Sequence, residues 1–238
     1  MSKYKVALWD LDDTLINTST AMELVCFDIA KEMDIDISEL NFKSFAEFDA
    51  DFWFNYKMGR ITVHQDIADD ICSAEEYLRA HRFYSFFGNI SFNDAKEFNQ
   101  RYQNSLKYYE ELENAKEVVE YIDSLNIKQC IATNGPVDLA LIKLDLLNIK
   151  DYIKDVFCHE NLGCNKPNPL FFHRILKRLD NPEKYETIIV GDSLYFDIHA
   201  GDNFGIDTCW YNPREKEVEE VMPTYEISNL IQLKKIIK

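Results

Sequence analysis

The segment Val6–Trp9 is apolar at every position, and it is followed at once by Asp10, Asp12, Asp13 and Thr14. A strand that is apolar throughout is typical of a parallel sheet covered on both faces. Acidic residues at the end of such a strand lie at the carboxyl edge of the sheet, where open α/β folds bind ligands. The segment therefore predicts a buried parallel strand that leads directly into a polar site.

Similar runs, rich in β-branched residues, recur along the chain and predict further strands. They lie at 4–9, 127–132, 155–158, 186–191 and 206–211. Stretches with helical periodicity separate them, so the expected fold class is α/β, with a Rossmann-like parallel sheet. We expect the tail, 213–238, to form a short acidic helix, a connector and a terminal helix that packs on the core.

Residues 16–110 interrupt this alternation. Apolar residues recur at helical spacing over 20–33, 62–80 and 93–109, and no stretch between them has the pattern of a buried strand. The position of this block just after the first strand predicts an inserted helical domain over the carboxyl edge of the sheet.

The expected domains are therefore a core formed by 1–15 and 111–238 and a helical cap domain at 16–110. Within the cap, the segment Phe52–Arg60 combines aromatic rings with the cations Lys57 and Arg60. Aromatic rings can stack on a nucleobase, although at helical spacing they are more often core residues. This segment is our candidate for contacts to the substrate.

Composition narrows the classes of partner. The 238 residues carry a formal net charge of −16, which argues against a nucleic-acid polymer or an anionic membrane as partner. The six cysteines form no C-x-x-C pair, and no apolar stretch approaches the length of a membrane span. We expect reduced cysteines and a cytoplasmic protein, as a monomer or homodimer.

Asp10 and Asp12 lie two residues apart, so their side chains leave an extended chain on the same side. Two neighbouring carboxylates repel each other unless a cation or a proton lies between them. The pair suits a Mg²⁺ site that leaves one acid for nucleophilic or proton-transfer chemistry.

The second predicted strand ends in Thr133-Asn134-Gly135-Pro136. Pro136 suits the first position of a helix, and the turn before it would offer a hydroxyl, an amide and free N–H groups to an anion. Ordinary helix capping would explain the same residues.

Two more polar positions follow in the second half of the chain. Lys166 precedes Pro167, which holds it in an extended, stiff loop, so its ammonium group could neutralise a carboxylate and a phosphoryl oxygen. Asp192 ends the apolar strand at 186–191, and Asp197 follows five residues later on the first turns of a helix. Asp192 is therefore expected at the same sheet edge as Asp10.

These four motifs, in this order, resemble those of the haloacid dehalogenase-like phosphohydrolases, over essentially residues 4–211. The string Asp10-x-Asp12-x-Thr14-Leu15 resembles the first motif, and Thr133 and Lys166 match the second and third. Gly191-Asp192 with Asp197 resembles the fourth motif. The block at 16–110 resembles the helical cap of the first cap class of this family.

The resemblance implies a role for each motif residue. Asp10 would attack phosphorus and form an aspartyl phosphate, while Asp12 would be the general acid and base. Mg²⁺ would be bound by Asp10, the backbone carbonyl of Asp12 and Asp192, with Asp197 as a supporting acid. Thr133 and Lys166 would hold the transferring phosphoryl group.

The expected substrate is a small phosphorylated metabolite. The Thr133-Asn134-Gly135 form is closer to the pyrimidine 5′-nucleotidase-like branch, so a nucleoside 5′-monophosphate is the first candidate, with Asn134 and Gly135 as substrate-binding residues. A sugar phosphate or phosphoglycolate is the alternative, and a phosphomutase or a 2-haloacid dehalogenase is less favoured. Dehalogenation needs neither a second acid nor Mg²⁺, yet Asp12 and Asp192 are both present.

Overall fold

A computed structural model describes residues 2–37, 45–61, 74–217 and 221–238 of the chain. The chain folds into two compact units. Residues 1–17 and 110–238 form one, here called the core unit, and residues 18–109 form the other, here called the helical unit.

The core unit contains a parallel six-stranded sheet in the order β3-β2-β1-β4-β5-β6. Its strands are β1 (Val6–Trp9), β2 (Lys128–Ala132), β3 (Asp155–Phe157), β4 (Thr187–Gly191), β5 (Asp207–Tyr211) and β6 (Tyr225–Ile227). The first five coincide closely with the apolar runs of the sequence, so the predicted parallel α/β sheet is confirmed.

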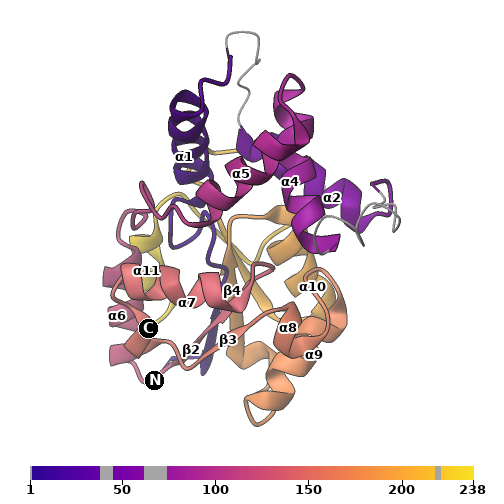
Figure 1. Cartoon of the computed structure of the whole chain (residues 1–238). Coiled ribbons are helices and arrows are strands. Elements are labelled where there is room, and N and C mark those ends of the chain that lie inside the picture. The colour runs from indigo at the N-terminus through magenta and orange to yellow at the C-terminus, as the bar shows by residue number, and fades with distance from the viewer. Residues whose placement is uncertain (1, 38–44, 62–73, 218–220) are drawn as a thin grey trace. The chain divides into compact units, whose positions relative to one another are not determined.

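Helices cover both faces of this sheet (Figure 1). On one side lie α6 (Ala115–Ser124), α7 (Val137–Leu146) and α11 (Leu233–Ile236), and on the other lie α8 (His159–Leu162), α9 (Pro169–Arg178) and α10 (Ala200–Phe204). The short helical turns of the unit are η1 (Lys150–Tyr152), η2 (Lys184–Glu186), η3 (Leu194–His199) and η4 (Leu230–Gln232).

The alternation of side chains along β1 explains why this strand is apolar throughout. Val6 and Leu8 belong to a buried cluster with Phe172 and other residues of α9 and α10. Trp9 points to the other face, where its indole N–H donates to Gln129 Oε1 at 3.1 Å and Gln129 Nε2 donates to the carbonyl of Val119 in α6 at 2.9 Å. Both faces of the strand are therefore buried, as a central parallel strand requires.

The tail differs from the sequence prediction. Residues 213–217 of the predicted acidic helix are not helical, residues 218–220 lie outside the described residues, and Tyr225–Ile227 forms the edge strand β6 beside β5. The predicted packing of the terminal segment on the core is confirmed, because Leu230, Leu233 and Ile237 are all fully buried. Three residues are too few to produce a recognisable strand pattern, which is why β6 was missed.

The helical unit consists, in its described part, of helices without strands. They are α1 (Thr18–Glu32), α2 (Phe45–Lys57), α4 (Ala74–Phe87) and α5 (Phe92–Gln103). The predicted helices at 20–33 and 93–109 correspond to α1 and α5. The prediction over 62–80 meets α4 only from Ala74 onward, since 62–73 lie outside the described residues, and α2 was not predicted.

Aromatic side chains form the interior of the helical unit. Phe45, Phe83 and Phe98 are fully buried in one cluster with residues of α1. The guanidinium carbon of Arg82 lies 4.4 Å from the Phe83 ring centroid, and Arg82 Nη1 donates to Asp49 Oδ1 at 2.5 Å. Most of the aromatic residues in this block are thus packing residues.

The expectations about membrane spans and cysteines can be compared with the described residues. None of the described helices is long and apolar enough to cross a membrane. The described cysteines, Cys26, Cys130, Cys158, Cys164 and Cys209, are buried free thiols, whereas Cys72 lies outside the described residues.

Candidate active site

The order of the strands reverses between the neighbouring strands β1 and β4. From β1 the chain proceeds outward through β2 to β3, then returns to β4 on the other side of β1 and continues to β5 and β6. Such a reversal in strand order is where open α/β sheets bind ligands. Asp10 directly follows β1, and Asp192 directly follows β4.

Thr14 ties these two strand ends together. Its hydroxyl donates to Asp10 Oδ2 at 3.3 Å and accepts a hydrogen bond from the backbone N–H of Asp192 at 3.1 Å. The threonine side chain is fully buried, so both hydrogen bonds are shielded from water. The threonine of the first motif therefore fixes the nucleophile candidate relative to the fourth motif.

Lys166 lies at the centre of the site. Its side chain is 2% exposed, and Nζ donates to Asp10 Oδ1 at 2.7 Å and to Asp197 Oδ1 at 2.6 Å. Burial alone lowers the pKa of this lysine, but the charges of Asp10 and Asp197 outweigh burial and raise it. The ammonium group is therefore charged, and it offsets the negative charge of the carboxylate that it contacts.

Asp197 holds Lys166 and has no free oxygen of its own. While Oδ1 accepts from Lys166, Oδ2 accepts from the backbone N–H of Ser193 at 3.1 Å. The carboxyl group packs directly on Gly191, where an added Cβ would lie 2.3 Å from Asp197 Oδ2. This contact explains why the fourth motif has a glycine at the end of β4.

A substitution of that glycine has a definite expected outcome. Gly191→Ala forces the Asp197 carboxylate away from β4, and Lys166 loses the partner that positions it. We expect kcat to fall by about 10- to 100-fold, as when a positioning contact is displaced by about an ångström. Steady-state kinetics measures the change in kcat. Gly201→Ala is the control, because a Cβ at Gly201 would also be crowded, but by Ile189 and Thr208 and not by the partner of Lys166.

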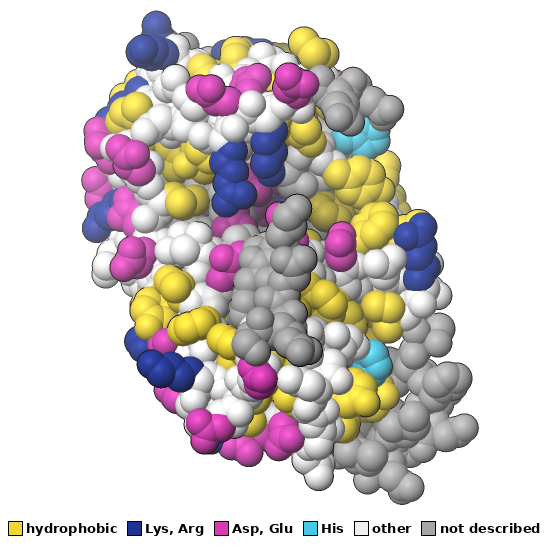
Figure 2. Space-filling model, turned by 90° about the horizontal axis from the view of Figure 1, so that it is seen from above, with side chains coloured by type: hydrophobic (Ala, Val, Ile, Leu, Met, Phe, Trp, Pro, Cys, Tyr) yellow, Lys and Arg dark blue, Asp and Glu magenta, His cyan; other side chains and the backbone are white. Residues whose placement is uncertain are grey.

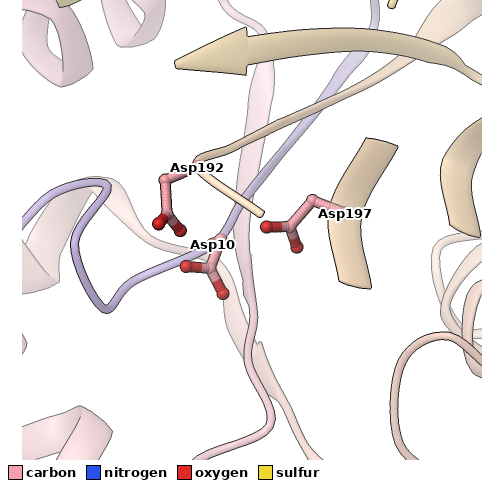
Figure 3. A group of neighbouring side chains, drawn as sticks. All are labelled: Asp10, Asp192 and Asp197. Carbon is pink, nitrogen blue, oxygen red and sulfur yellow. The ribbon is translucent and has the colours of Figure 1, made fainter. Parts of the chain in front are cut away.

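Three carboxylates converge at this edge of the sheet (Figure 3). One oxygen from each of Asp10, Asp192 and Asp197 lies within 4.8 Å of the others. Burial raises the pKa of Asp10 to about 7, with Asp197 and Asp12 adding to the effect and Lys166 opposing it. Burial and the neighbouring Asp10 also raise the pKa of Asp192.

This donor set fits a divalent cation such as Mg²⁺, which binds oxygen ligands. Burial and mutual repulsion raise the pKa values of both acids, and a cation between Asp10 and Asp192 would stabilise their charged forms. Asp197 is the poorest ligand of the three, because its side chain is 1% exposed and its oxygens accept at 2.6 and 3.1 Å, whereas the Asp10 side chain is 11% exposed and its Oδ2 accepts only a long hydrogen bond of 3.3 Å from Thr14. Asp10 and Asp192 are thus the side chains best able to hold the metal.

The end of β2 adds hydroxyl and amide groups on the same edge. Thr133 is buried, and its Oγ1 accepts from the N–H of Gly135 at 2.9 Å. The Asn134 side chain forms two hydrogen bonds with the Lys166 backbone, one to its carbonyl at 3.1 Å and one from its N–H at 2.9 Å. Asn134 thus joins the second motif to the third.

The structure adds one functional candidate that the sequence prediction did not include. Lys143 of α7 is 3% exposed at its side chain, and its ammonium group forms an ion pair with Asp12 Oδ1. α7 begins at Val137, so Pro136 is its N-cap residue, whereas the sequence predicts Pro136 as the first residue of the helix. The helical spacing in the sequence could have identified this residue, because Lys143 lies on the same apolar face as Ala140, Leu144 and Leu147.

The segment Phe52–Arg60, predicted to contact the substrate, contains both packing residues and exposed residues of the helical unit. Phe52 is buried, and the Trp53 indole N–H donates to Asp49 Oδ1 at 3.2 Å, so these two are packing residues. Phe54, Tyr56 and Met58 are 38%, 39% and 56% exposed. The Lys57 side chain lies outside the described part of the chain.

Comparison with known proteins agrees with the geometry. The profile of the family described as haloacid dehalogenase-like hydrolase matches residues 7–211. Pyrimidine 5′-nucleotidase PynA of Streptococcus pneumoniae is 29% identical over 226 residues, which cover 94% of this chain and 91% of that protein. Ribulose-1,5-bisphosphate 5-phosphatase of Halopiger xanaduensis is 31% identical over 216 residues, 88% of this chain and 85% of that protein.

A solved structure extends the likeness to three dimensions. The magnesium-bound HAD-hydrolase YfnB of Bacillus subtilis superposes with a TM-score of 0.80 at 26% identity, covering 98% of both chains.

Proposed function

The chain belongs to the haloacid dehalogenase-like hydrolase family, and from this premise we propose that it is a phosphoric monoester hydrolase. It requires Mg²⁺ and acts through an aspartyl-phosphate intermediate. The observation that carries the proposal is the placement of Asp10 between the buried Lys166 and the half-buried Asp192, at the switch point of the sheet.

In the first step, a carboxylate oxygen of Asp10 attacks phosphorus, and the bond between phosphorus and the leaving oxygen breaks. Lys166 and Thr133 hold the phosphoryl oxygens in line for this attack. Asp12 donates a proton to the leaving oxygen, so that the product departs as a neutral alcohol.

In the second step, Asp12 takes a proton from a water molecule that attacks the phosphorus of the aspartyl phosphate. The acyl–phosphate bond breaks, and Asp10 and inorganic phosphate are released. When bound, Mg²⁺ would supply positive charge between the nucleophile and the phosphoryl group, held by Asp10, Asp192 and the backbone carbonyl of Asp12. Asp197 keeps Lys166 in place throughout both steps.

The substrate class is a small phosphorylated metabolite, with a nucleoside 5′-monophosphate as the first candidate. The pyrimidine 5′-nucleotidase named above supports this choice, and the ribulose-1,5-bisphosphate phosphatase supports sugar phosphates as the alternative. The net charge of −16 disfavours polymeric nucleic acid as a substrate. On the face shown in Figure 2, basic side chains occur in small groups beside acidic ones and do not form the continuous basic surface that such a polymer would need.

We assign the helical unit, residues 18–109, the role of a cap that selects the leaving group. Its exposed aromatic side chains at Phe54 and Tyr56 can stack on a base, whereas Trp53 is used in packing. Phosphorylated metabolites compared for released phosphate in the presence of Mg²⁺ test the proposal. We expect nucleoside 5′-monophosphates to rank above sugar phosphates, and a protein that releases phosphate from none of them is not a phosphatase of this kind.

The role of Asp12 makes a separate prediction. Asp12→Asn removes the transferable proton, so kcat on an alkyl phosphate should fall by about 10²- to 10⁴-fold. The loss should be much smaller on p-nitrophenyl phosphate, whose leaving group departs without protonation. Equal losses on both substrates, measured by steady-state kinetics, would contradict the assignment.

A further inference from the structure

We infer that Lys143 is the residue that positions Asp12 for proton transfer to and from the substrate. The inference rests on the proposed function, because it assigns a partner to the proposed general acid and base. It concerns a residue outside all four motifs, on the helix that follows the second motif.

The location of Lys143 is unusual for a lysine. Ala140, Lys143 and Leu144 form the buried face of α7, and Leu147 continues it one turn later. An ammonium group on such a face must lose its hydration, which is costly unless a negative partner compensates. The carboxylate of Asp12 is such a partner, and its ion pair with Lys143 joins β1's polar end to α7.

Asp12 also lies close to the second motif. An added Cβ at Gly135 would lie 3.5 Å from Asp12 Oδ2, so this oxygen is against the backbone of the second motif. Oδ1 meanwhile contacts Lys143. The carboxylate therefore lies between Lys143, which it contacts, and the glycine of the second motif, and 33% of the Asp12 side chain remains exposed and able to reach a substrate.

Asp12 and Lys143 also share a small surface pocket with the second motif. Its lining includes Thr133, Gly135 and Leu139 as well as the ion pair. A phosphoryl group held by Thr133 thus has the Asp12 carboxylate beside it. Lys143 determines where in this pocket the carboxylate lies.

The two acids of the first motif consequently have separate lysines. Lys166 binds Asp10, and Lys143 binds Asp12. Without Lys143, the Asp12 carboxylate would occupy several orientations, and only a fraction would be productive for proton transfer.

The test compares Lys143→Met with the wild type on two substrates, uridine 5′-monophosphate and p-nitrophenyl phosphate. Methionine keeps the apolar stem and removes the charge. We expect kcat on uridine 5′-monophosphate to fall by roughly 10- to 100-fold, a part of the usual contribution of a general acid and base, with KM unchanged. On p-nitrophenyl phosphate kcat should change less than about 3-fold, because that leaving group needs no proton.

A double-mutant cycle separates positioning from a structural role. In the Asp12→Asn background, Lys143→Met should cause no further loss on uridine 5′-monophosphate, because the group that Lys143 positions is already gone. Additive losses in the double variant, equal losses on the two substrates, or an effect confined to KM would each overturn the inference.

Folding and specificity controls complete the experiment. Lys150→Met removes an exposed ion pair with Asp145 near the end of α7 and should leave both rates unchanged. The ratio of the two rates within one variant does not depend on the folded fraction, so partial unfolding cannot imitate the result. If Lys143→Met does not fold, Lys143→Arg, which keeps the charge but displaces Asp12, must show the same selective loss. A wild-type protein without phosphatase activity would instead refute the proposed function itself.

Discussion

Asp10→Asn should abolish phosphate release while the protein stays folded. The variant keeps the shape of the side chain and removes the nucleophilic oxygen, so no aspartyl phosphate can form. We expect kcat to fall by at least about 10⁴-fold on every phosphomonoester, including p-nitrophenyl phosphate, because loss of a covalent nucleophile is not rescued by a good leaving group.

The fold should tolerate this change. Lys166 keeps Asp197 as a partner at 2.6 Å when Asp10 becomes neutral. Burial raises the pKa of Asp10, so the charged form is already unfavourable in the folded protein, and a neutral amide removes that penalty. Thermal unfolding should therefore show a melting temperature no lower than that of the wild type.

Asp13→Asn is the matched control, since it makes the same change of charge in the same motif. Asp13 has a φ of 59°, a conformation that asparagine also adopts readily. This variant should retain activity within a few-fold. Mass spectrometry of acid-quenched wild type should find a phosphoryl adduct on the peptide that contains Asp10, and the adduct should be absent from Asp10→Asn. Substantial turnover by Asp10→Asn would eliminate the covalent mechanism.

Removal of divalent cations should have an effect of similar size. Chelation with EDTA should abolish activity, and Mg²⁺ or Mn²⁺ should restore it, because the available ligands are carboxylate oxygens. Asp192→Asn should lose activity that no excess of Mg²⁺ fully restores. Full phosphate release after chelation would contradict the metal requirement, whereas chloride release from 2-haloacids without phosphate release from any phosphomonoester would establish the dehalogenase alternative.

Metal binding should also be visible without turnover. Because the pKa of Asp10 is raised to about 7, its contribution to the stability of the metal-free protein is present at low pH and is lost as pH rises through this value. Mg²⁺ should therefore raise the melting temperature more at about pH 8 than at about pH 6, where protons compete for the carboxylate. An equal shift at both pH values would exclude Asp10 as a ligand.

The sequence was most informative where a buried strand ends in a polar residue. Asp10 and Asp192 could be placed at one sheet edge from this pattern alone, and the structure brings them together. Lys143 was missed because a single lysine in a helix is usually solvated, and only its position on the apolar face distinguishes it. Segments whose position depends on packing, such as α2 and the three-residue β6, gave no sufficient local pattern.

The central position of β1 also affects how the protein folds. Trp9 pairs with Ile131 on one side and with Val190 on the other, so both neighbours of the first strand are made from the second half of the chain. Contacts of such long sequence separation close large loops, and they slow folding. During synthesis, β1 can pair with β2 first but lacks its second sheet partner until β4 has emerged, so the site that Asp10 and Asp192 share can form only after both strands have been made.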